Sequence, residues 1–584
     1  MRKNILFAFG VLVAASCVNK EYDITKPIDT TMNVGGQIEM PVPGESSYSY
    51  TLGDILLPDD ATADGVLKKL DNGSFCFVIE PSEGINEKYT FGQITAADYA
   101  KNDSHTFVAL ESAIGQEVDY PVSVPLNLQV SGIDGSVETI READLDALLT
   151  LAVETVGGTR ISIKSGYKFT LPEFIYIDES TLPSFAEIDA AAKSAGHRNV
   201  IVIKEAQTFD GVFSLSCHIN KLELSNFGIS EGIMHIAGDA TAEGKIAFMK
   251  FALSDGVQFP LETIVKITGV KATSVTMKAS PTIVGEDQAI QVSEVPEALN
   301  DIDFELADVG LFVSVKNETP FTAAISANIS AFSGGNYTDP VAVRPESGFS
   351  VASNTAGMNF CLSDSGEYGT AADRKIKLPG LAGLVSPVPE KLQISGIRVT
   401  GSAGSEDGFV TVAVGKEYHL GLSYRIEAPL SFRALTLKRD ENIDVNLDLG
   451  DDISFDDLFI KATFTNTLPL DAVLTFDLVD GDGNAVQGVS LKYEDENGNR
   501  IDALVLSAGS IETPSSGNLK LVAVADDGSH ISKIQSLRLH IVASSPENSV
   551  VTLNAAQSLS VSNIIVGTNS GIFIDGNKNS DKNE

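Results

Sequence analysis

The sequence predicts a mainly β protein made of tandem antiparallel β-sandwich domains of the immunoglobulin-like kind, with two short helices in its N-terminal half. Three observations lead to this fold class. Short apolar runs alternate with turn residues along most of the chain, which is the spacing of all-β domains. Helix-start signals are clear at only two places, and the second half contains an internal repeat.

The first strands are expected from Gln37 onward. Examples are the runs Phe75 to Ile79 and Val122 to Val130, while the turn Asp71-Asn72-Gly73 precedes the first of them. β-Branched and aromatic residues bounded by Gly, Asn and Asp are typical of strands and their turns.

A first helix is expected to begin at Thr139, where Thr139 and Glu142 have the spacing of a capping box. It would end at Gly157. Its apolar positions would be Leu145, Leu148, Leu149 and Ala152.

A second helix is expected from Ser184, because Ser184 and Glu187 form another capping box. Three alanines from Ala190 continue it, and Gly196 would end it. From Val200 onward, strands are expected almost without interruption.

The internal repeat joins two segments that lie 149 residues apart. The segment Val315 to Phe321 contains Asn317 and Pro320, and it recurs as Phe464 to Leu470 with Asn466 and Pro469. An alternating apolar strand follows each copy, and a short match near Phe304 and Phe455 precedes each. We therefore expect one strand–turn–strand unit used twice, with the two asparagines in equivalent turn positions.

Expected boundaries follow from these signals. Residues 1–16 would be a leader, 17–36 a tether, 37–160 a β-rich domain with one helix and 161–285 a β domain with one helix. Residues 286–440 and 441–575 would be the two β-sandwich repeat units, and 576–584 a disordered polar tail.

The composition excludes some functions. The net charge of −38 would repel a phosphate backbone, so no nucleic-acid partner is expected. Four cysteines are present, and Cys76, Cys217 and Cys361 each lie in a short apolar run, which indicates small buried side chains rather than a disulfide framework.

The N-terminus has the pattern of an export signal. Arg2 and Lys3 precede an apolar run from Ile5 to Ala15, which is too short to span a bilayer, since that takes about 20 residues. The run ends at Ala14-Ala15-Ser16-Cys17. It resembles a bacterial lipobox, which implies cleavage before Cys17 and a diacylglycerol on its thiol that anchors the protein to a membrane. Ordinary signal-peptidase cleavage is the alternative, because Ala14-Ala15-Ser16 is also small-x-small.

The residues after Cys17 resemble the start of uncharacterised outer-membrane lipoproteins of the Bacteroidales. Lys20-Glu21-Tyr22-Asp23 is similar to their surface-export signal, and Asp29-Thr30-Thr31 is similar to their O-glycosylation motif. This resemblance implies an outer-membrane location, at the cell surface or on the periplasmic face, and makes Thr30 a candidate glycosylation site. Chance is the alternative explanation of so short a motif.

Calcium is the one metal that the sequence suggests. Asp480, Asp482 and Asn484 open like a calcium loop, but Ala485 and Leu491 replace the glycine and the glutamate that such a loop needs. A hairpin turn is the alternative and better interpretation. A second acidic group, which is more typical of a solvated loop, comprises Asp448, Asp451, Asp452, Asp456 and Asp457.

No catalytic motif of the common hydrolase, nucleotide-binding or metalloprotease types occurs, so we expect no enzyme and no cofactor. Glycan binding is disfavoured because the chain has no tryptophan and its 28 phenylalanines lie mostly in apolar runs. Tyr48 and Tyr50 share one strand face and form only a thin platform. The leading hypothesis is a non-enzymatic envelope lipoprotein acting as scaffold, adhesin or binding subunit. The alternatives are a glycan-binding subunit of a nutrient-uptake system and a fimbrillin-like structural subunit.

Overall fold

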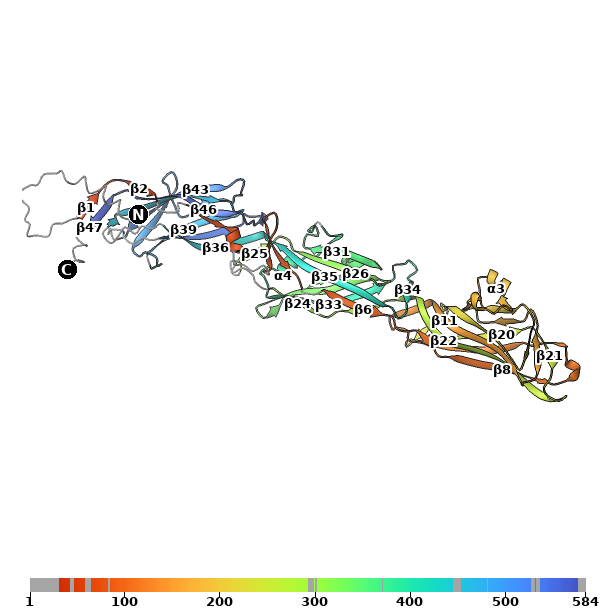
Figure 1. The fold of residues 1–584 in the computed structure, drawn as a ribbon. Helices are drawn as coiled ribbons and strands as arrows, with labels where there is room; N and C mark the ends of the chain where they lie inside the picture. Colours follow the sequence, from red (N-terminus) through yellow and green to blue (C-terminus); the bar gives the residue numbers. More distant parts are fainter. Residues whose placement is uncertain are drawn as a thin grey trace, which may run out of the picture. The chain divides into compact units, whose positions relative to one another are not determined.

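The computed structural model describes residues 31–41, 47–57, 65–81, 84–292, 299, 302–369, 371–444, 453–480, 482–526, 531 and 536–575. The chain forms two compact units (Figure 1). Unit 1 contains residues 1–76, 294–307 and 429–584, and unit 2 contains residues 77–293 and 308–428. The chain therefore leaves unit 1 and returns to it twice, and each unit is built from segments distant in the sequence.

Unit 1 is a β-sandwich with one sheet in the order β2-β46-β38-β43-β40-β41, where β3 also pairs with β46. Its strands are β2 (Ile38–Pro41), β3 (Tyr48–Thr51), β38 (Asp457–Asn466), β40 (Val489–Glu494), β41 (Arg500–Ile501), β43 (Ser515–Ala525) and β46 (Ser558–Thr568). The other sheet has the order β25-β36-β44-β39-β42, with β45 beside β36. Its strands are β25 (Asp303–Leu306), β36 (Ser431–Asp444), β39 (Asp471–Val479), β42 (Leu504–Leu506), β44 (Ser536–Ser544) and β45 (Val551–Thr552).

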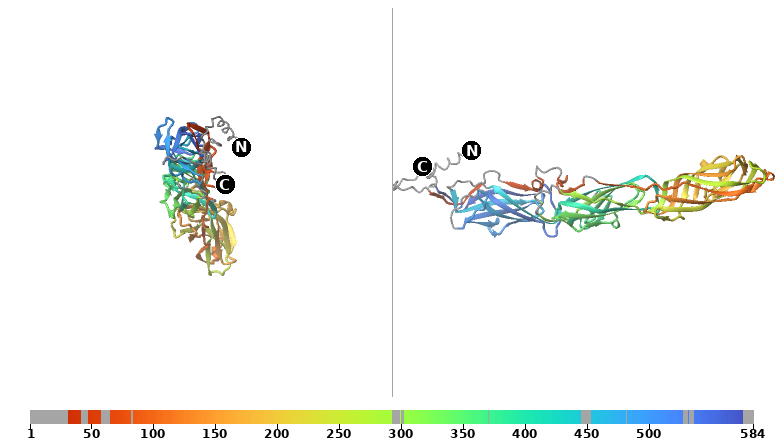
Figure 2. Two further views of the ribbon diagram at one scale, coloured as in Figure 1. Left: turned by 90° about the vertical axis from the view of Figure 1, so that its left-hand side faces the viewer. Right: turned by 90° about the horizontal axis from the view of Figure 1, so that it is seen from below.

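The first and last described strands of the chain lie side by side in unit 1. Strand β47 (Ile572–Asp575) pairs with both β1 (Thr31–Val34) and β37 (Ile453–Phe455) in a small antiparallel sheet. Figure 2 shows the red N-terminal strands among the blue C-terminal ones. A short helix, α2 (Leu52–Leu56), follows β3, and the Thr51 side chain caps it by accepting a hydrogen bond from the Asp54 backbone N–H.

Unit 2 contains a second sandwich. One of its sheets has the order β32-β31-β26-β35-β5-β4, with β6 also beside β35. Its strands are β4 (Leu67–Lys69), β5 (Phe75–Ile79), β6 (Ile85–Thr90), β26 (Gly310–Asn317), β31 (Thr355–Ser363), β32 (Arg374–Lys377) and β35 (Glu417–Pro429); along the chain, β4 and the ends of β5 and β35 fall in unit 1. The other sheet is formed by β23 (Thr282–Val284), β24 (Gln288–Gln291), β27 (Thr322–Ser333), β28 (Asn336–Tyr337), β29 (Val341–Val343), β30 (Ser350–Val351) and β33 (Lys391–Ser402). The helix α4 (Leu381–Leu384) precedes β33.

The rest of unit 2 is a large twisted sheet with a smaller one beside it. The large sheet is β7 (Thr95–Ala96), β8 (Tyr99–Val108), β10 (Val122–Ser131), β11 (Val137–Thr155), β13 (Lys168–Thr170), β14 (Ile175–Ile177), β15 (Ala186–Ile188), β16 (Val200–Ile203), β18 (Val212–Glu223), β19 (Ile229–Ser230), β20 (Ile233–Glu243), β22 (Gln258–Ala279) and β34 (Val410–Ala413). The smaller sheet is β9 (Glu117–Asp119), β12 (Arg160–Ile163), β17 (Gln207–Asp210) and β21 (Lys245–Lys250).

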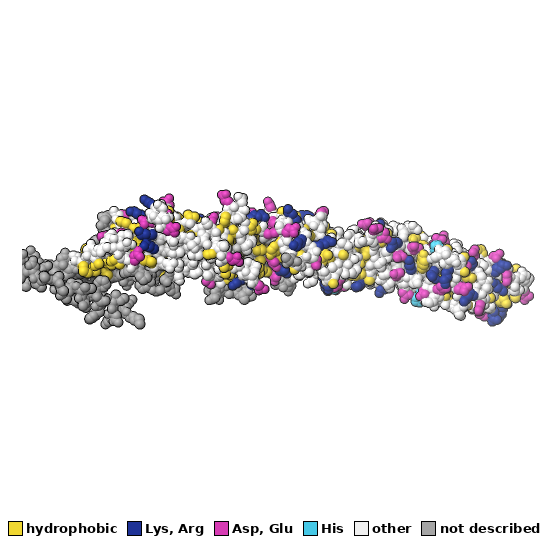
Figure 3. All heavy atoms as spheres, turned by 90° about the horizontal axis from the view of Figure 1, so that it is seen from above, with side chains coloured by type: hydrophobic (Ala, Val, Ile, Leu, Met, Phe, Trp, Pro, Cys, Tyr) yellow, Lys and Arg dark blue, Asp and Glu magenta, His cyan; other side chains and the backbone are white. Residues whose placement is uncertain are grey.

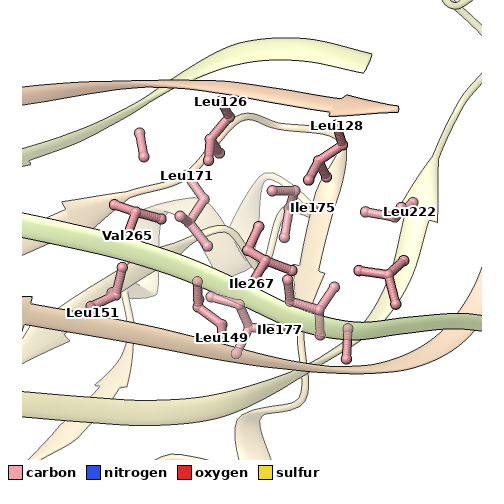
Figure 4. Packing of buried hydrophobic residues seen from close by; sticks show 14 of the residues in the cluster. Leu126, Leu128, Leu149, Leu151, Leu171, Ile175, Ile177, Leu222, Val265 and Ile267 are labelled. Carbon is pink, nitrogen blue, oxygen red and sulfur yellow. The ribbon is translucent and has the colours of Figure 1, made fainter. Parts of the chain in front are cut away.

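Alternating side chains from these strands form the core of this part of unit 2. Figure 4 shows aliphatic side chains of β10, β11, β14, β18 and β22 pointing toward one another between the ribbons. Leu149 and Ile175 are fully buried there. Strands with every second side chain buried are what period-two apolar patterns predict, so the expected β class is confirmed.

The repeat is also confirmed. Asn317 ends β26 and Asn466 ends β38, and both side chains are fully buried. The Asn317 Nδ2 donates to the Phe321 carbonyl (2.8 Å) and the Ala352 carbonyl (2.9 Å). The Asn466 Nδ2 donates likewise to the Leu470 carbonyl (2.8 Å) and the Ser507 carbonyl (3.0 Å).

Each buried asparagine closes a turn that carries the chain from one sheet of its sandwich to the other. Strands β26 and β27 belong to different sheets, and so do β38 and β39. The Asn317 Oδ1 accepts the Thr319 backbone N–H (3.1 Å), as the Asn466 Oδ1 accepts that of Leu468 (2.9 Å). The asparagine side chain thus satisfies backbone groups that no strand can reach in such a turn.

The first expected helix is wrong, because the segment after Thr139 is the long strand β11. Leu145 and Leu149 are buried, while Leu148 between them is 41% exposed, which is the period of a strand and not of a helix. Strand β11 pairs along most of its length with β18 on one side and β22 on the other. Pairing on both edges outweighs the local capping box and helical propensities.

The second expected helix exists but is shorter. Residues 186–188 form β15, and the helix α3 (Ala190–Ser194) begins after Asp189, whose carboxylate accepts the backbone N–H groups of Ala191 and Ala192. Gly196 follows it with a φ of +88°, as the stop signal predicts. The N-terminal half thus has two short α-helices in its described residues, α2 and α3, although α2 is not where the sequence placed one.

The expected domain boundaries need correction. The boundary at 160/161 falls inside one sheet, because β11 pairs with β18 and β22 beyond it. The first repeat unit begins before residue 286, since β23 already pairs with β33. The second begins before residue 441, since β36 starts at Ser431 and pairs with β44.

Acidic and basic side chains are mixed over the face of the molecule seen in Figure 3. The excess of acid therefore does not form a single-sign patch on that face. Such a surface favours solubility over electrostatic steering of one charged partner.

Candidate functional site

Several site residues expected from the sequence lie outside the described residues. These are the lipidation residue Cys17, the glycosylation candidate Thr30, and the acidic residues Asp448, Asp451 and Asp452.

Asp480, Asp482 and Asn484 lie in a tight turn after β39. The Asp480 Oδ1 accepts the backbone N–H of Asp482 (3.0 Å) and of Asn484 (2.9 Å). The Asp480 backbone N–H donates to the Asn484 carbonyl (2.9 Å), and Gly483 has a φ of +82°. This is a turn in which the aspartate binds its own backbone, as the turn interpretation predicts.

The same turn occurs a second time, after β40. The Asp495 Oδ1 accepts the backbone N–H of Asn497 (2.9 Å) and of Asn499 (2.8 Å), and Gly498 has a φ of +78°. Hydrogen bonds from the Asn499 side chain and backbone lower the pKa of Asp495. The same turn geometry therefore occurs twice, with an aspartate carboxylate accepting the backbone N–H groups two and four residues further on.

Asp457 is a member of the second acidic group, and it lies at the start of β38. Its carboxylate accepts hydrogen bonds from Thr568 (3.0 Å) and from the backbone and hydroxyl of Ser570 (3.0 and 2.6 Å). Partial burial would raise its pKa, but the bonds from Ser570, Asn569 and Thr568 together lower it. Through these hydrogen bonds, Asp457 connects the start of β38 to the C-terminal end of β46 and the residues that follow it.

Three cysteines lie among the described residues, and all three are core residues. Cys76, Cys217 and Cys361 are buried, as expected, and burial raises the pKa of Cys217 to about 12 and that of Cys361 to about 11. Thiolate chemistry needs a lowered pKa instead. His218 points away from Cys217 and pairs with Asp146. No group of three His, Cys, Asp or Glu side chains fit for a metal ion occurs in the described ranges.

The tyrosine pair on β3 does not form a sugar platform. Tyr48 and Tyr50 are both half-buried, and Tyr50 lines an apolar cavity of about 120 Å³ within unit 1. Burial raises the pKa of Tyr50 to about 12. A half-buried ring beside an internal cavity contributes to core packing rather than to an exposed stacking surface.

A polar groove of about 450 Å³ lies in unit 2, and we call it the Tyr424 groove. A volume of this size is in the usual range for small-molecule sites. Its lining residues are Glu80, Pro81, Gly84, Phe312, Val313, Ser314, Asn359, Phe360, Ala371, Ser423, Tyr424 and Arg425.

Strand register decides which of these side chains share a face. Ser314 on β26 lies opposite Ser423 on β35 and Asn359 on β31. Because cross-strand partners point to the same side of a sheet, these three polar side chains form one patch on the outer face. Phe312 and Arg425, another cross-strand pair, lie beside them on the same face.

The groove lies beside β35 at the point where the pairing of β35 with β6 ends. Strand β6 pairs with β35 only from Glu417 to Leu422, and the chain reaches it through Gly84. A Cβ atom at Gly84 would stand 2.7 Å from the Leu422 carbonyl, so only glycine lets the chain run this close. Val313, Phe360 and Tyr424, which are buried, are also among the lining residues.

Tyr424 is the exceptional residue of the groove. It is 6% exposed, and its hydroxyl has no hydrogen-bond partner in the described part of the chain. Burial raises its pKa to about 12, so the hydroxyl is neutral at physiological pH. Buried polar groups are nearly always hydrogen-bonded, so this hydroxyl, which is closed off from solvent, destabilises the fold as it stands.

The charged residues at the groove are largely compensated. The Arg425 Nε donates to Glu427 (2.7 Å), and its guanidinium lies over the Phe312 ring, 4.6 Å from the centroid. The Tyr368 hydroxyl donates to the second oxygen of Glu427 (3.3 Å). The groove is therefore polar without being a strongly cationic or anionic site.

Sequence analysis missed the Tyr424 groove, although one local signal existed. In β35 the inward positions are Tyr418, Leu420, Leu422, Tyr424, Ile426 and Ala428. A buried tyrosine in such a face needs a partner for its hydroxyl. The other lining residues come from distant segments, and no sequence pattern connects them.

Comparisons with known proteins identify no family for the chain. No family model matches it, and no curated protein does. Among solved structures, a protein from Parabacteroides distasonis described as secreted matches with 13% identity over 51% of this chain and 90% of its own length, at a TM-score of 0.34. A structure of Sulfolobus turreted icosahedral virus matches with 9% identity over 85% of this chain and 99% of its own, at a TM-score of 0.10. At these TM-scores neither likeness shows the fold or the function of this chain.

The helices of the described ranges are short. None of them is both long enough and apolar enough to cross a membrane.

Proposed function

We propose that this chain is a lipid-anchored, non-enzymatic protein of the bacterial outer membrane that binds a small ligand in the Tyr424 groove. The observation that carries the binding role is the groove itself, in which Ser314, Ser423 and Asn359 form one polar patch on the outer face of the sheet.

Anchoring rests on Cys17. Two or three acyl chains on this residue would hold the protein at the membrane without a transmembrane helix. The first described strand, β1, begins at Thr31 and pairs with β47 at the other end of the described chain. Cys17→Ala should therefore move the protein from the membrane fraction to the soluble fraction. Membrane retention of the variant with normal processing would disprove the anchor.

No resident cofactor and no nucleic-acid partner belong to this proposal. The supporting observations are the net charge of −38 and the raised pKa values of Cys217 and Cys361. Both argue against phosphate binding and against thiol catalysis.

The binding role can be tested by ligand retention. The full-length protein is incubated with a small-molecule extract of spent culture medium, and retained compounds are measured by affinity-selection mass spectrometry. Ser423→Trp places a large ring in the groove at an exposed position, and Ser214→Trp makes the same change on an exposed position of β18 as a control.

Compounds retained by the wild type and by Ser214→Trp, but lost in Ser423→Trp, are expected. Equal retention by all three proteins, or no retained compound at all, would refute a binding role for the groove.

A further inference from the structure

We infer that the apolar cavity beside Tyr50 in unit 1, which we call the Ala543 cavity, binds the alkyl chain of a free fatty acid. This cavity is separate from the Tyr424 groove, which lies in unit 2, so the inference does not depend on the function proposed above. It follows from the volume and lining of the cavity, from its opening at the edge of one sheet and from the charge at that opening.

The Ala543 cavity lies between the two sheets of unit 1 and has a volume of about 120 Å³. Tyr50 of β3 and Leu559 of β46, which are cross-strand partners, line it from one sheet. Ile541 and Ala543 of β44 line it from the other sheet, and the helix α2 contributes further apolar side chains. The wall is therefore built from both sheets and is almost entirely apolar.

The small side chain of Ala543 leaves room for this cavity. The inward positions of β44 are Leu537, Leu539, Ile541 and Ala543, all of them buried, and the alanine is the smallest of the four. Empty apolar space destabilises a fold, because the atoms that line it lose van der Waals contacts. An apolar cavity of about 150 Å³ takes benzene, so a volume of about 120 Å³ has room for roughly five carbon atoms.

The cavity opens at one edge of β36. Strand β25 pairs with β36 only as far as Thr436, and no other described strand pairs with this edge beyond that residue. The next three residues, Leu437, Lys438 and Arg439, all line the cavity. Leu437 is half-buried, while Lys438 and Arg439 are exposed. The lining thus runs from the buried Ala543 to solvent, which gives a narrow chain a path inward.

The charge at this opening is basic, although the whole chain has a net charge of −38. Lys438 and Arg439 are the charged residues among the described lining residues. Arg439 lies opposite Ile541 in the pairing of β36 with β44, so its side chain leaves from the sheet face that lines the cavity. It already donates to Glu441, whereas Lys438 forms no ion pair with a described residue. Lys438 is therefore available to an anionic group at the opening.

These features select a ligand with one alkyl chain and an anionic head. An alkyl chain loses no hydrogen bond when it enters an apolar cavity, whereas a polar chain would. A carboxylate can stay in water at the opening, where Lys438 attracts it, while a cationic head would be repelled there. A second alkyl chain has no room in about 120 Å³, so a diacyl lipid fits poorly.

The experiment measures binding of straight-chain fatty acids to residues 18–584 by isothermal titration. This chain contains every described residue, and without the lipid anchor it needs no detergent that would compete for the cavity. The series runs from hexanoate to tetradecanoate, at concentrations below micelle formation. Decyltrimethylammonium is the probe with a long alkyl chain and the opposite head charge.

The affinity should rise about fourfold for each methylene group that enters the cavity, and it should stop rising once the tail fills the cavity. Decyltrimethylammonium should bind about tenfold more weakly than decanoate, because two basic residues attract one head and repel the other. Lys438→Gln should weaken decanoate binding about threefold, as expected for one exposed ion pair. Lys492→Gln, at an exposed lysine of β40, should bind like the wild type.

Ala543→Ile fills the cavity and should abolish binding. Ala462→Ile makes the same change on β38, at a half-buried position that does not line the cavity, and should bind decanoate normally. Urea unfolding of Ala543→Ile shows whether the variant is folded. The chain-length series uses only the wild-type chain, so it decides the inference even if Ala543→Ile fails to fold.

Four results would overturn the inference. They are the absence of binding by every fatty acid, an affinity that keeps rising unchanged to tetradecanoate, wild-type binding by a folded Ala543→Ile, and equal binding of decanoate and decyltrimethylammonium. The second of these is the behaviour of adsorption to an open surface, since a closed cavity limits the length of chain that it can bury.

Discussion

Replacing Tyr424 by phenylalanine should leave unit 2 at least as stable as it is in the wild type, although most changes to a buried side chain destabilise a protein. The reason is that the lost hydroxyl is buried, in a residue only 6% exposed, and has no partner among the described residues. An unsatisfied buried polar group destabilises a fold by about 1–3 kcal/mol. The small void left by the oxygen offsets part of this, so we expect a gain of about 1 kcal/mol in the free energy of unfolding.

Tyr120→Phe is the matched control in the same unit. The Tyr120 hydroxyl is also buried, but it donates to the Leu261 carbonyl (3.2 Å) and lies 3.0 Å from the Thr263 hydroxyl. Removing it leaves these two groups without their partner. We expect Tyr120→Phe to destabilise unit 2 by about 1–3 kcal/mol.

The assay is urea unfolding of the full chain followed by far-ultraviolet circular dichroism, because the chain has no tryptophan and the variants alter tyrosine emission. The two units should be fitted as separate transitions. A loss of stability in Tyr424→Phe as large as that in Tyr120→Phe would show that the Tyr424 hydroxyl has a partner.

Three further predictions concern the turns and a histidine. Asn466→Ala should destabilise unit 1 by about 3 kcal/mol in urea unfolding, because it leaves buried backbone groups without their hydrogen-bond partner. An unchanged midpoint of the unfolding transition would contradict this. Hydrogen bonds to the carboxylates of Asp440 and Asp477 raise the pKa of His540. This pairing therefore stabilises unit 1 below about pH 6.5, and its contribution to stability is lost as the pH rises through the raised pKa. The stability difference between wild type and His540→Gln should therefore be larger at about pH 5.5 than at about pH 8.5, and a difference independent of pH would refute the pairing. Millimolar calcium should not raise the melting temperature more than magnesium does; a calcium-specific rise of several degrees, lost in Asp480→Ala, would restore a calcium site.

Local patterns were reliable where a short segment sets its own structure. The turns after Asn317 and Asn466 have matching hydrogen bonds, and their sequence match was visible because asparagine, proline and the alternating strand lie within a few residues. The turn at Asp480 was readable for the same reason, since its carboxylate binds backbone groups two and four residues away.

Local patterns failed where distant strands decide. The segment after Thr139 has a capping box and helix-compatible leucines, but it lies between β18 and β22. Its inward positions, such as Leu145 and Leu149, also alternate with period two. Both periods are present in the sequence, and only the pairing on both edges selects the strand.

The sequence by itself determined the β class, the repeat with its asparagine turns and the expectation of a lipid anchor at Cys17, because each depends on residues close together in the chain. Only the tertiary structure decided which segments share a sheet, and with that the Tyr424 groove. Glu80, Ser314, Asn359 and Tyr424 lie far apart in the sequence and meet because strands pair laterally. Lateral pairing is set by the burial of whole sheet faces, a quantity that no short stretch of sequence contains.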